Sequence, residues 1–214
     1  MKTNQLFKST LTLTTALLLS ATVSQAALYR VTIDTSALSS GVNAPNGPYS
    51  LDFQLNDGNL LNNNTATISN FTFTGGGAPF GSANTFGGAS GSLANTVTLT
   101  DSSAFNEFYQ SFAAGTFIEF DLNLTSNVAV GQTPDSFSFS ILEGDLDSIT
   151  TTGFGNTLLQ FDIDNTNPTS MDFVVSSGTG DYSGMNVTVI PEPSAAVFGL
   201  LACGFGMLRR RRSA

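Results

Sequence analysis

The chain has 214 residues, with seven basic against sixteen acidic side chains, no His, no Trp, one Cys and a formal net charge of −9. Without His, a Ser-His-Asp triad and a histidine metal centre are excluded, and a single Cys excludes an internal disulfide. So few Lys and Arg cannot neutralise a phosphate backbone, so nucleic acid is excluded as a partner.

Residues 1–26 are typical of a secretory signal peptide. Lys2 and Lys8 make a positive start, and residues 11–19 form an apolar Leu/Thr/Ala run. Small side chains then mark a cleavage site, whose −3, −1 and +1 positions are Ser24, Ala26 and Ala27. We therefore expect the leader to direct export through the general secretory pathway and to be removed after Ala26.

Residues 27–189 are long enough for one domain with a hydrophobic core. The leader holds two of the seven basic residues and the last six positions hold four, which leaves Arg30 alone against 15 acids, a net charge of −14. This balance predicts a polyanionic domain that is stabilised by packing, with or without bound cations.

The same composition argues against an enzyme. Lys and Cys are absent from residues 27–189, which excludes a Schiff base and a thiol nucleophile. Carboxylate pairs remain, namely Glu143 with Asp145 or Asp147, and Glu107 with Glu119. Clefts that cleave sugars usually present Trp and Tyr, and this chain has no Trp and four Tyr. We therefore predict that the domain is not catalytic.

Alternating polar and apolar residues rich in Phe, Val, Ile and Thr predict an all-β domain. Clusters of Asn, Gly, Ser, Asp and Pro separate the runs. The expected strands cover residues 28–34, 51–55, 67–73, 97–99, 117–124, 136–141, 159–164 and 185–189. Residues 105–112 fit either a strand or a short helix. Together these elements predict an antiparallel two-layer β-sandwich, of which a jelly roll is one form.

Phenylalanine should dominate the core of this sandwich, because the chain contains 18 of them. Alternation places side chains two residues apart on the same face of a strand. The side chains expected to point inward are Phe53, Phe71, Phe73, Phe120, Leu122, Phe137, Phe139 and Phe161.

Residues 75–91 contain seven glycines and no Lys, so they do not form a phosphate-binding loop. We expect a flexible connection between strands.

A calcium site is one interpretation of the acidic turn Glu143-Gly144-Asp145-Leu146-Asp147, because hard cations prefer several oxygen ligands on a turn. Solvent-exposed acids are the alternative, and it is favoured for Asp162 and Asp164, which alternation places together on one face of a strand. No other cofactor is expected.

The tail carries three features in sequence. Pro191-Glu192-Pro193-Ser194 is followed by the apolar residues 195–208 and then by four arginines, at positions 209, 210, 211 and 212. Both prolines oppose a helix, and Ser194 can cap one that begins after it. Fourteen residues span about 21 Å as a helix, which is short for a bilayer of about 30 Å. Arg209, Arg210, Arg211 and Arg212 would hold that end in the cytoplasm.

This tail resembles the PEP-CTERM sorting signal of Gram-negative bacteria, with Ile190 where Val is commoner. The resemblance covers residues 190–214 and implies recognition by exosortase, a protease-transpeptidase of the inner membrane. It also implies a host that makes biofilm or flocs and exopolysaccharide. The expected route is therefore a transit intermediate in the inner membrane, with the domain in the periplasm, followed by the cell surface or the extracellular space.

Two functions follow for the domain. One is a non-catalytic protein of the cell surface or extracellular matrix, associated with exopolysaccharide. The other is a calcium-assisted module that binds a carbohydrate or another ligand.

Overall fold

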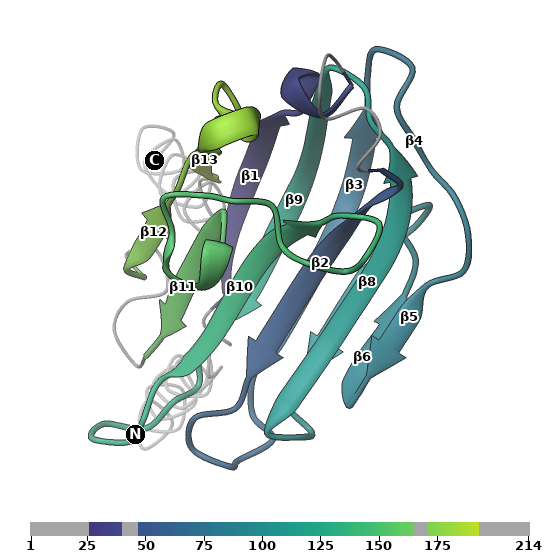
Figure 1. Ribbon diagram of the computed structural model, residues 1–214. Coiled ribbons are helices and arrows are strands. Elements are labelled where there is room, and N and C mark those ends of the chain that lie inside the picture. Colours follow the sequence, from purple (N-terminus) through teal and green to yellow (C-terminus); the bar gives the residue numbers. More distant parts are fainter. Residues whose placement is uncertain (1–25, 40–46, 165–170, 193–214) are drawn as a thin grey trace, which may run out of the picture.

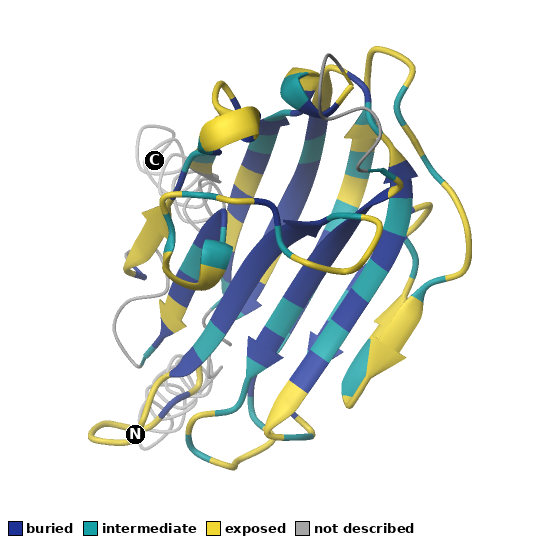
Figure 2. Cartoon of the chain, in the orientation of Figure 1, coloured by how far each residue is buried: buried dark blue, intermediate teal, exposed yellow. Residues whose placement is uncertain are grey.

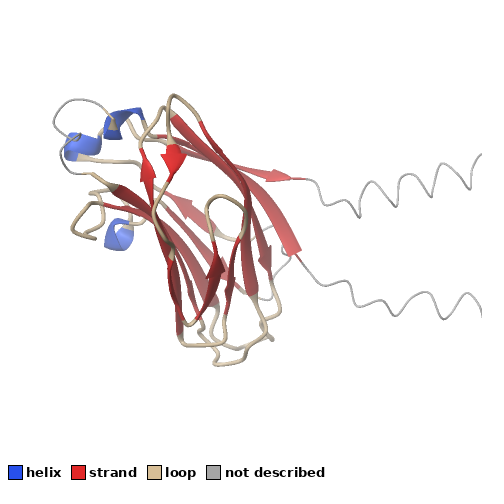
Figure 3. Cartoon of the chain, turned by 90° about the vertical axis from the view of Figure 1, so that its right-hand side faces the viewer, coloured by secondary structure: helices blue, strands red, loops and turns tan. Residues whose placement is uncertain are grey.

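The computed structural model describes residues 26–39, 47–164 and 171–192. Two antiparallel sheets pack face to face (Figures 1 and 3), which confirms the predicted all-β class and the β-sandwich. The helical segments in the described residues are short 3-10 turns: η1 (Ser36–Leu38), η3 (Phe154–Asn156) and η5 (Gly180–Tyr182).

Sheet 1 contains the strands nearest to both ends of the described chain. Its order is β13 (Val187–Glu192), β1 (Ala26–Asp34), β9 (Phe117–Thr125), β3 (Thr65–Phe73), β7 (Val97–Thr100) and β6 (Gly88–Gly91). The central strands β1 and β9 pair along their full nine-residue length, from Ala26 beside Thr125 to Asp34 beside Phe117.

Sheet 2 covers the other side of the core. Its order is β12 (Phe173–Val175), β11 (Leu159–Ile163), β10 (Asp135–Leu142), β2 (Tyr49–Asn56), β8 (Phe105–Ala113) and β4 (Ala78–Pro79), and β5 (Asn84–Phe86) also pairs with β8. Residues 105–112, which fitted a strand or a helix, therefore form a strand.

The core lies between the sheets and centres on Phe53. Figure 2 shows buried and less buried residues alternating along β8, beside β2, in which most residues are buried. The Phe53 ring lies 5.1–6.4 Å, centroid to centroid, from five other phenylalanine rings, those of Phe71, Phe108, Phe120, Phe137 and Phe139. Most of the side chains predicted to point inward are fully buried, namely Phe53, Phe120, Leu122, Phe137, Phe139 and Phe161. Phe71 and Phe73 are partly buried and pack against the same cluster.

A bulge in β3 brings Phe71 and Phe73 to the core. Strict alternation would put Ile68 and Phe71 on opposite faces, because they are three residues apart. The register instead shifts, since Ser69 pairs with Asp121 and Thr72 pairs with Glu119. One extra residue is thus accommodated near Asn70, whose φ of 55° is left-handed.

The glycine-rich segment 75–91 differs from the flexible loop that we expected. It crosses the open edge of the sandwich and supplies β4 and β5 to sheet 2 and β6 to sheet 1. Glycine allows this close path, because a Cβ at Gly88 would lie 2.2 Å from Thr100 Oγ1.

Candidate functional site

The chain enters and leaves the described fold at the same end of sheet 1. Ala26, the first residue of β1, pairs with the last residue of β9, and Leu28 pairs with Glu192, the last residue of β13. We call this the export end, and the opposite end, which carries η1 and η5, the distal end. The predicted leader and the predicted sorting tail therefore attach side by side.

The predicted sorting motif begins inside the sheet, two residues beyond the domain boundary expected at 189. Pro191 pairs with Tyr29 and Glu192 with Leu28. Proline is tolerated here because β13 is an edge strand, so no further strand needs its missing amide hydrogen. The other predicted sorting residues, Pro193, Ser194 and Arg209–Arg212, lie outside the described residues.

The predicted cleavage residues of the leader also lie partly inside and partly outside the described residues. Ala26 and Ala27 open β1, while Ser24 lies outside the described residues, as does the apolar segment 195–208. Within residues 26–39, 47–164 and 171–192, no helix has both the length and the apolar character needed to cross a bilayer.

The acidic turn predicted as a calcium site lies at the distal end, after β10. The backbone N–H of Glu143 donates to the carbonyl of Asp147 at 2.8 Å, and Asp147 N–H donates to Asp145 Oδ1 at 3.2 Å. The Glu143 carboxylate accepts a hydrogen bond from the Tyr182 hydroxyl, whereas Asp145 and Asp147 are exposed. Among the described residues, no three Asp, Glu, His or Cys side chains are placed to hold one metal ion together.

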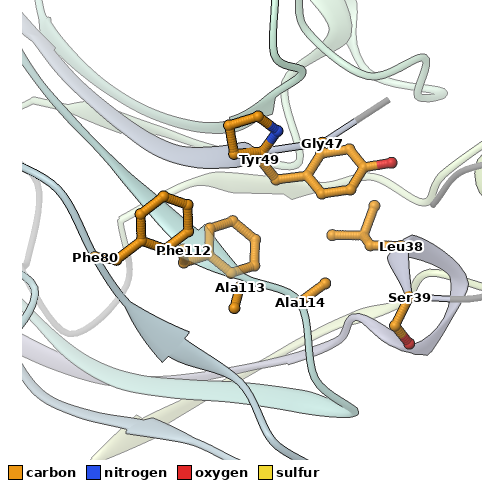
Figure 4. A pocket seen from close by; sticks show the side chains of 9 residues that line it. Leu38, Ser39, Gly47, Tyr49, Phe80, Phe112, Ala113 and Ala114 are labelled. Atoms are coloured by element: carbon orange, nitrogen blue, oxygen red, sulfur yellow. The ribbon is translucent and has the colours of Figure 1, made fainter. Parts of the chain in front are cut away.

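A pocket of about 280 Å³ opens at the distal end (Figure 4). Its wall consists mainly of apolar and aromatic side chains, including Leu38, Tyr49, Phe80 and Phe112. Ser39 and Gly47 border it, and residues 40–46 between them lie outside the described residues. The described lining contains no Asp, Glu, Asn or Gln, so it offers no carboxylate or side-chain amide ligand to a calcium ion.

A second polar feature lies on the outer face of sheet 2. Asp52 is 2% exposed, and its Oδ2 accepts a hydrogen bond from Gln54 Nε2 at 2.8 Å, while its Oδ1 is buried without a partner. The same Gln54 nitrogen donates to Glu107 Oε1 at 3.2 Å. Burial, and then the charge of Glu107, raise the pKa of Asp52 from its ordinary 3.8 to about 7.

One of the carboxylate pairs considered for a glycosidase, Glu107 with Glu119, is divided between the two sheets. Glu107 lies on β8 in sheet 2, and Glu119 lies on β9 in sheet 1, where Arg30 Nε is 3.7 Å from Glu119 Oε1 and 3.1 Å from Asp121 Oδ1. The sheets' common core separates the two positions.

A third polar cluster, at the export end, was missed by sequence reasoning. Asp101 is 1% exposed and Asp135 is fully buried. The pKa of Asp135 is raised, mainly by burial, and the charges of Asp101 and Asp57 raise it further. Hydrogen bonds from Asn64 and from the Gly58 N–H lower this pKa in part. The sequence gives only a weak sign of this cluster, namely that residues 57–64 are rich in Asn and Asp. The carboxylates that this loop contacts lie up to 77 positions away in the chain.

Comparisons of the chain with protein-family models, with curated proteins and with solved structures find no match.

Proposed function

We propose that this chain is an exported, non-catalytic protein of the cell surface or extracellular matrix, sorted through its C-terminal tail by exosortase. The observation that carries the proposal is the pairing of Leu28 with Glu192. It attaches leader and tail to one end of the sandwich, so the distal end can face away from the inner membrane while both segments engage it. A tail that emerged at the distal end would have to run back along the domain.

The charge of the domain supports a role in a hydrated matrix. Arg30 is the single base between residues 27 and 190, and its guanidinium group is held by Asp121 and Glu119 on sheet 1. The remaining acids make a polyanion, which stays soluble and associates with exopolysaccharide through divalent ions rather than through direct ion pairs.

The residue types in the domain and the positions of its carboxylates support a non-catalytic role. The described residues contain no imidazole, thiol or amine nucleophile, and Glu107 and Glu119 lie on different sheets. Glu143 is engaged by Tyr182. A calcium-assisted sugar-binding module is the second candidate, and the distal pocket would be its site, although the described wall supplies aromatic rings and no carboxylate.

A single isosteric substitution tests the sorting step. Glu192→Gln keeps the length of β13 and removes the charge at the centre of the Pro-Glu-Pro motif. In a host that has exosortase, we expect the variant to accumulate with its tail intact in the membrane fraction, while the parent is found in the processed, extracellular fraction.

Asp145→Asn is the matched control, because it removes one exposed carboxylate from the distal end and should be sorted like the parent. Equal processing of the parent and of Glu192→Gln would contradict recognition through this motif.

A further inference from the structure

Two buried carboxylates at the export end are held by one loop. Asp101 follows β7 and Asp135 begins β10, and residues 57–64 contact both. Asp101 Oδ2 accepts hydrogen bonds from the backbone N–H groups of Asn63 at 3.0 Å and Asn64 at 2.7 Å. Asp135 accepts from Asn64 Nδ2 at 2.6 Å and from Gly58 N–H at 2.8 Å. Asn64 therefore joins the two acids.

Two oxygen atoms of this cluster have no donor. Asp101 Oδ1 and Asn63 Oδ1 are buried and accept no hydrogen bond, although the Asn63 amide N–H is bonded to the other oxygen of Asp101. Asp135 differs, because both of its oxygens accept. A buried acceptor without a donor is unfavourable, and more so when it carries charge. These two atoms can each accept a donor or bind a cation, and the same loop also holds a buried donor without an acceptor, Asn59 Nδ2.

Within the described residues, no basic side chain contacts this cluster. Asp57 adds a third carboxylate from the same loop, and its Oδ1 accepts the N–H of Asn59 at 3.0 Å. Arg30, the single basic residue between positions 26 and 192, is bonded to Asp121 and lies near Glu119. A buried charge without a counter-charge is strongly unfavourable, and a metal ion is one of the few ways to compensate it.

We propose that the export end binds one calcium ion, with Asp101 Oδ1 as its charged ligand and Asn63 Oδ1 as a second oxygen ligand. Carboxylate and amide oxygens suit a hard cation, and the absence of His and Cys excludes a site of the zinc type. The described residues place no three acidic side chains around one ion, so the remaining ligands would be backbone carbonyls and water. Bound calcium would fix the 57–64 loop to β7 and β10, beside the point where leader and tail attach.

The ligand set predicts a weak site. With one charged ligand, the affinity should resemble that of extracellular modules, with a dissociation constant of about 10⁻⁴ to 10⁻³ M. Calcium at that concentration is available outside the cell, so the ion would be taken up after export. The site does not depend on the mechanism of sorting, so its failure would leave the proposed sorting function intact.

Calorimetric titration of calcium into the full-length chain, purified in detergent and freed of metal, tests the proposal in 0.15 M NaCl. We expect one saturable site in the parent and a melting temperature that rises with calcium. Asp101→Asn keeps the side-chain shape and an acceptor for the two amides, and it should abolish both effects. The double variant with Asp145→Asn and Asp147→Asn, which alters the exposed distal turn, should bind like the parent.

A second variant decides the matter if Asp101→Asn does not fold. Asn63→Asp leaves the backbone N–H in place and adds a second charged ligand, so calcium should bind about tenfold more tightly. Three results would overturn the proposal: no saturable binding in the parent, binding that is lost only in the distal double variant, or unchanged affinity in Asn63→Asp.

Discussion

Asp52 shows how one side chain can set the response of the fold to pH. Its carboxyl group is almost completely buried on the outer face of β2, close to Glu107 and without a basic partner. The folded protein therefore holds a proton on Asp52 at pH values where the unfolded chain has released it. The contribution of Asp52 to the free energy of unfolding is therefore fully present below about pH 4 and is lost as the pH rises through about 7.

The Asp52→Asn variant should remove this dependence. Because the pKa rises from 3.8 to about 7, the substitution should raise the free energy of unfolding near pH 8 by roughly 2–4 kcal/mol and change it little near pH 4. Urea unfolding at several pH values measures the effect. Asp145→Asn, on an exposed side chain, is the control, and an equal gain in both variants would show that general charge repulsion, not burial, is responsible.

Asn70 determines which face of β3 reaches the core. Its left-handed φ of 55° allows the bulge that turns Phe71 and Phe73 inward, and its Nδ2 donates to Asp121 Oδ2 at 2.7 Å. Phe71 and Phe73 were correctly predicted to point inward, but the bulge was not predicted, although the alternation of residue type breaks once, between Ile68 and Phe71.

Two substitutions separate backbone geometry from the hydrogen bond. Asn70→Gly and Asn70→Val both remove the bond to Asp121, but only valine resists a positive φ. We expect Asn70→Val to be less stable than Asn70→Gly by about 1–2 kcal/mol in thermal or urea unfolding. Equal stability of the two variants would contradict a left-handed residue at this bulge.

At the scale of elements, the strands with strong alternation were predictable and the short edge strands were not. Eight expected runs correspond to strands in the two sheets, because one buried face imposes a period of two. The three-residue strand β12 was missed, since its apolar Phe173, Val174 and Val175 do not alternate. Strands β4, β5 and β6 were missed because their pairing depends on the long strand β8 and on β7, which no local pattern reveals.

The two sheets are joined chiefly by phenylalanine, which gives a direct test of the sandwich. Phe53→Ala should reduce the free energy of unfolding by about 3–5 kcal/mol, because the removed ring contacts rings from both sheets. Phe154, which is 93% exposed, provides the control, and Phe154→Ala should change stability by less than about 0.5 kcal/mol. A small loss in Phe53→Ala would show that the core is not centred on this residue.

For the whole molecule, the sequence predicts a route of export but predicts little about what the domain does. The leader and the tail are continuous motifs, so their residues could be recognised in order along the chain. The polar cluster of Asp101, Asp135 and Asn64 could not, because its members are 34–71 positions apart and meet only when β7 and β10 pack beside the 57–64 loop.

The arrangement of the ends is compatible with the proposed export and sorting. Antiparallel pairing of β1 and β13 brings Leu28 and Glu192 together, so removal of the leader after Ala26 and of the tail near Pro191 to Ser194 would both take place at the export end. The strands of the core would remain intact after both cleavages, because the residues lost lie at the outer limits of β1 and β13.

Mass spectrometry of the C-terminus of the extracellular protein decides whether the tail is cleaved during sorting. We predict a mature chain that ends between Pro191 and Ser194, with β13 retained and the apolar segment absent. Extracellular protein that still carries residues 195–208 or Arg209–Arg212 would contradict sorting by cleavage of the tail.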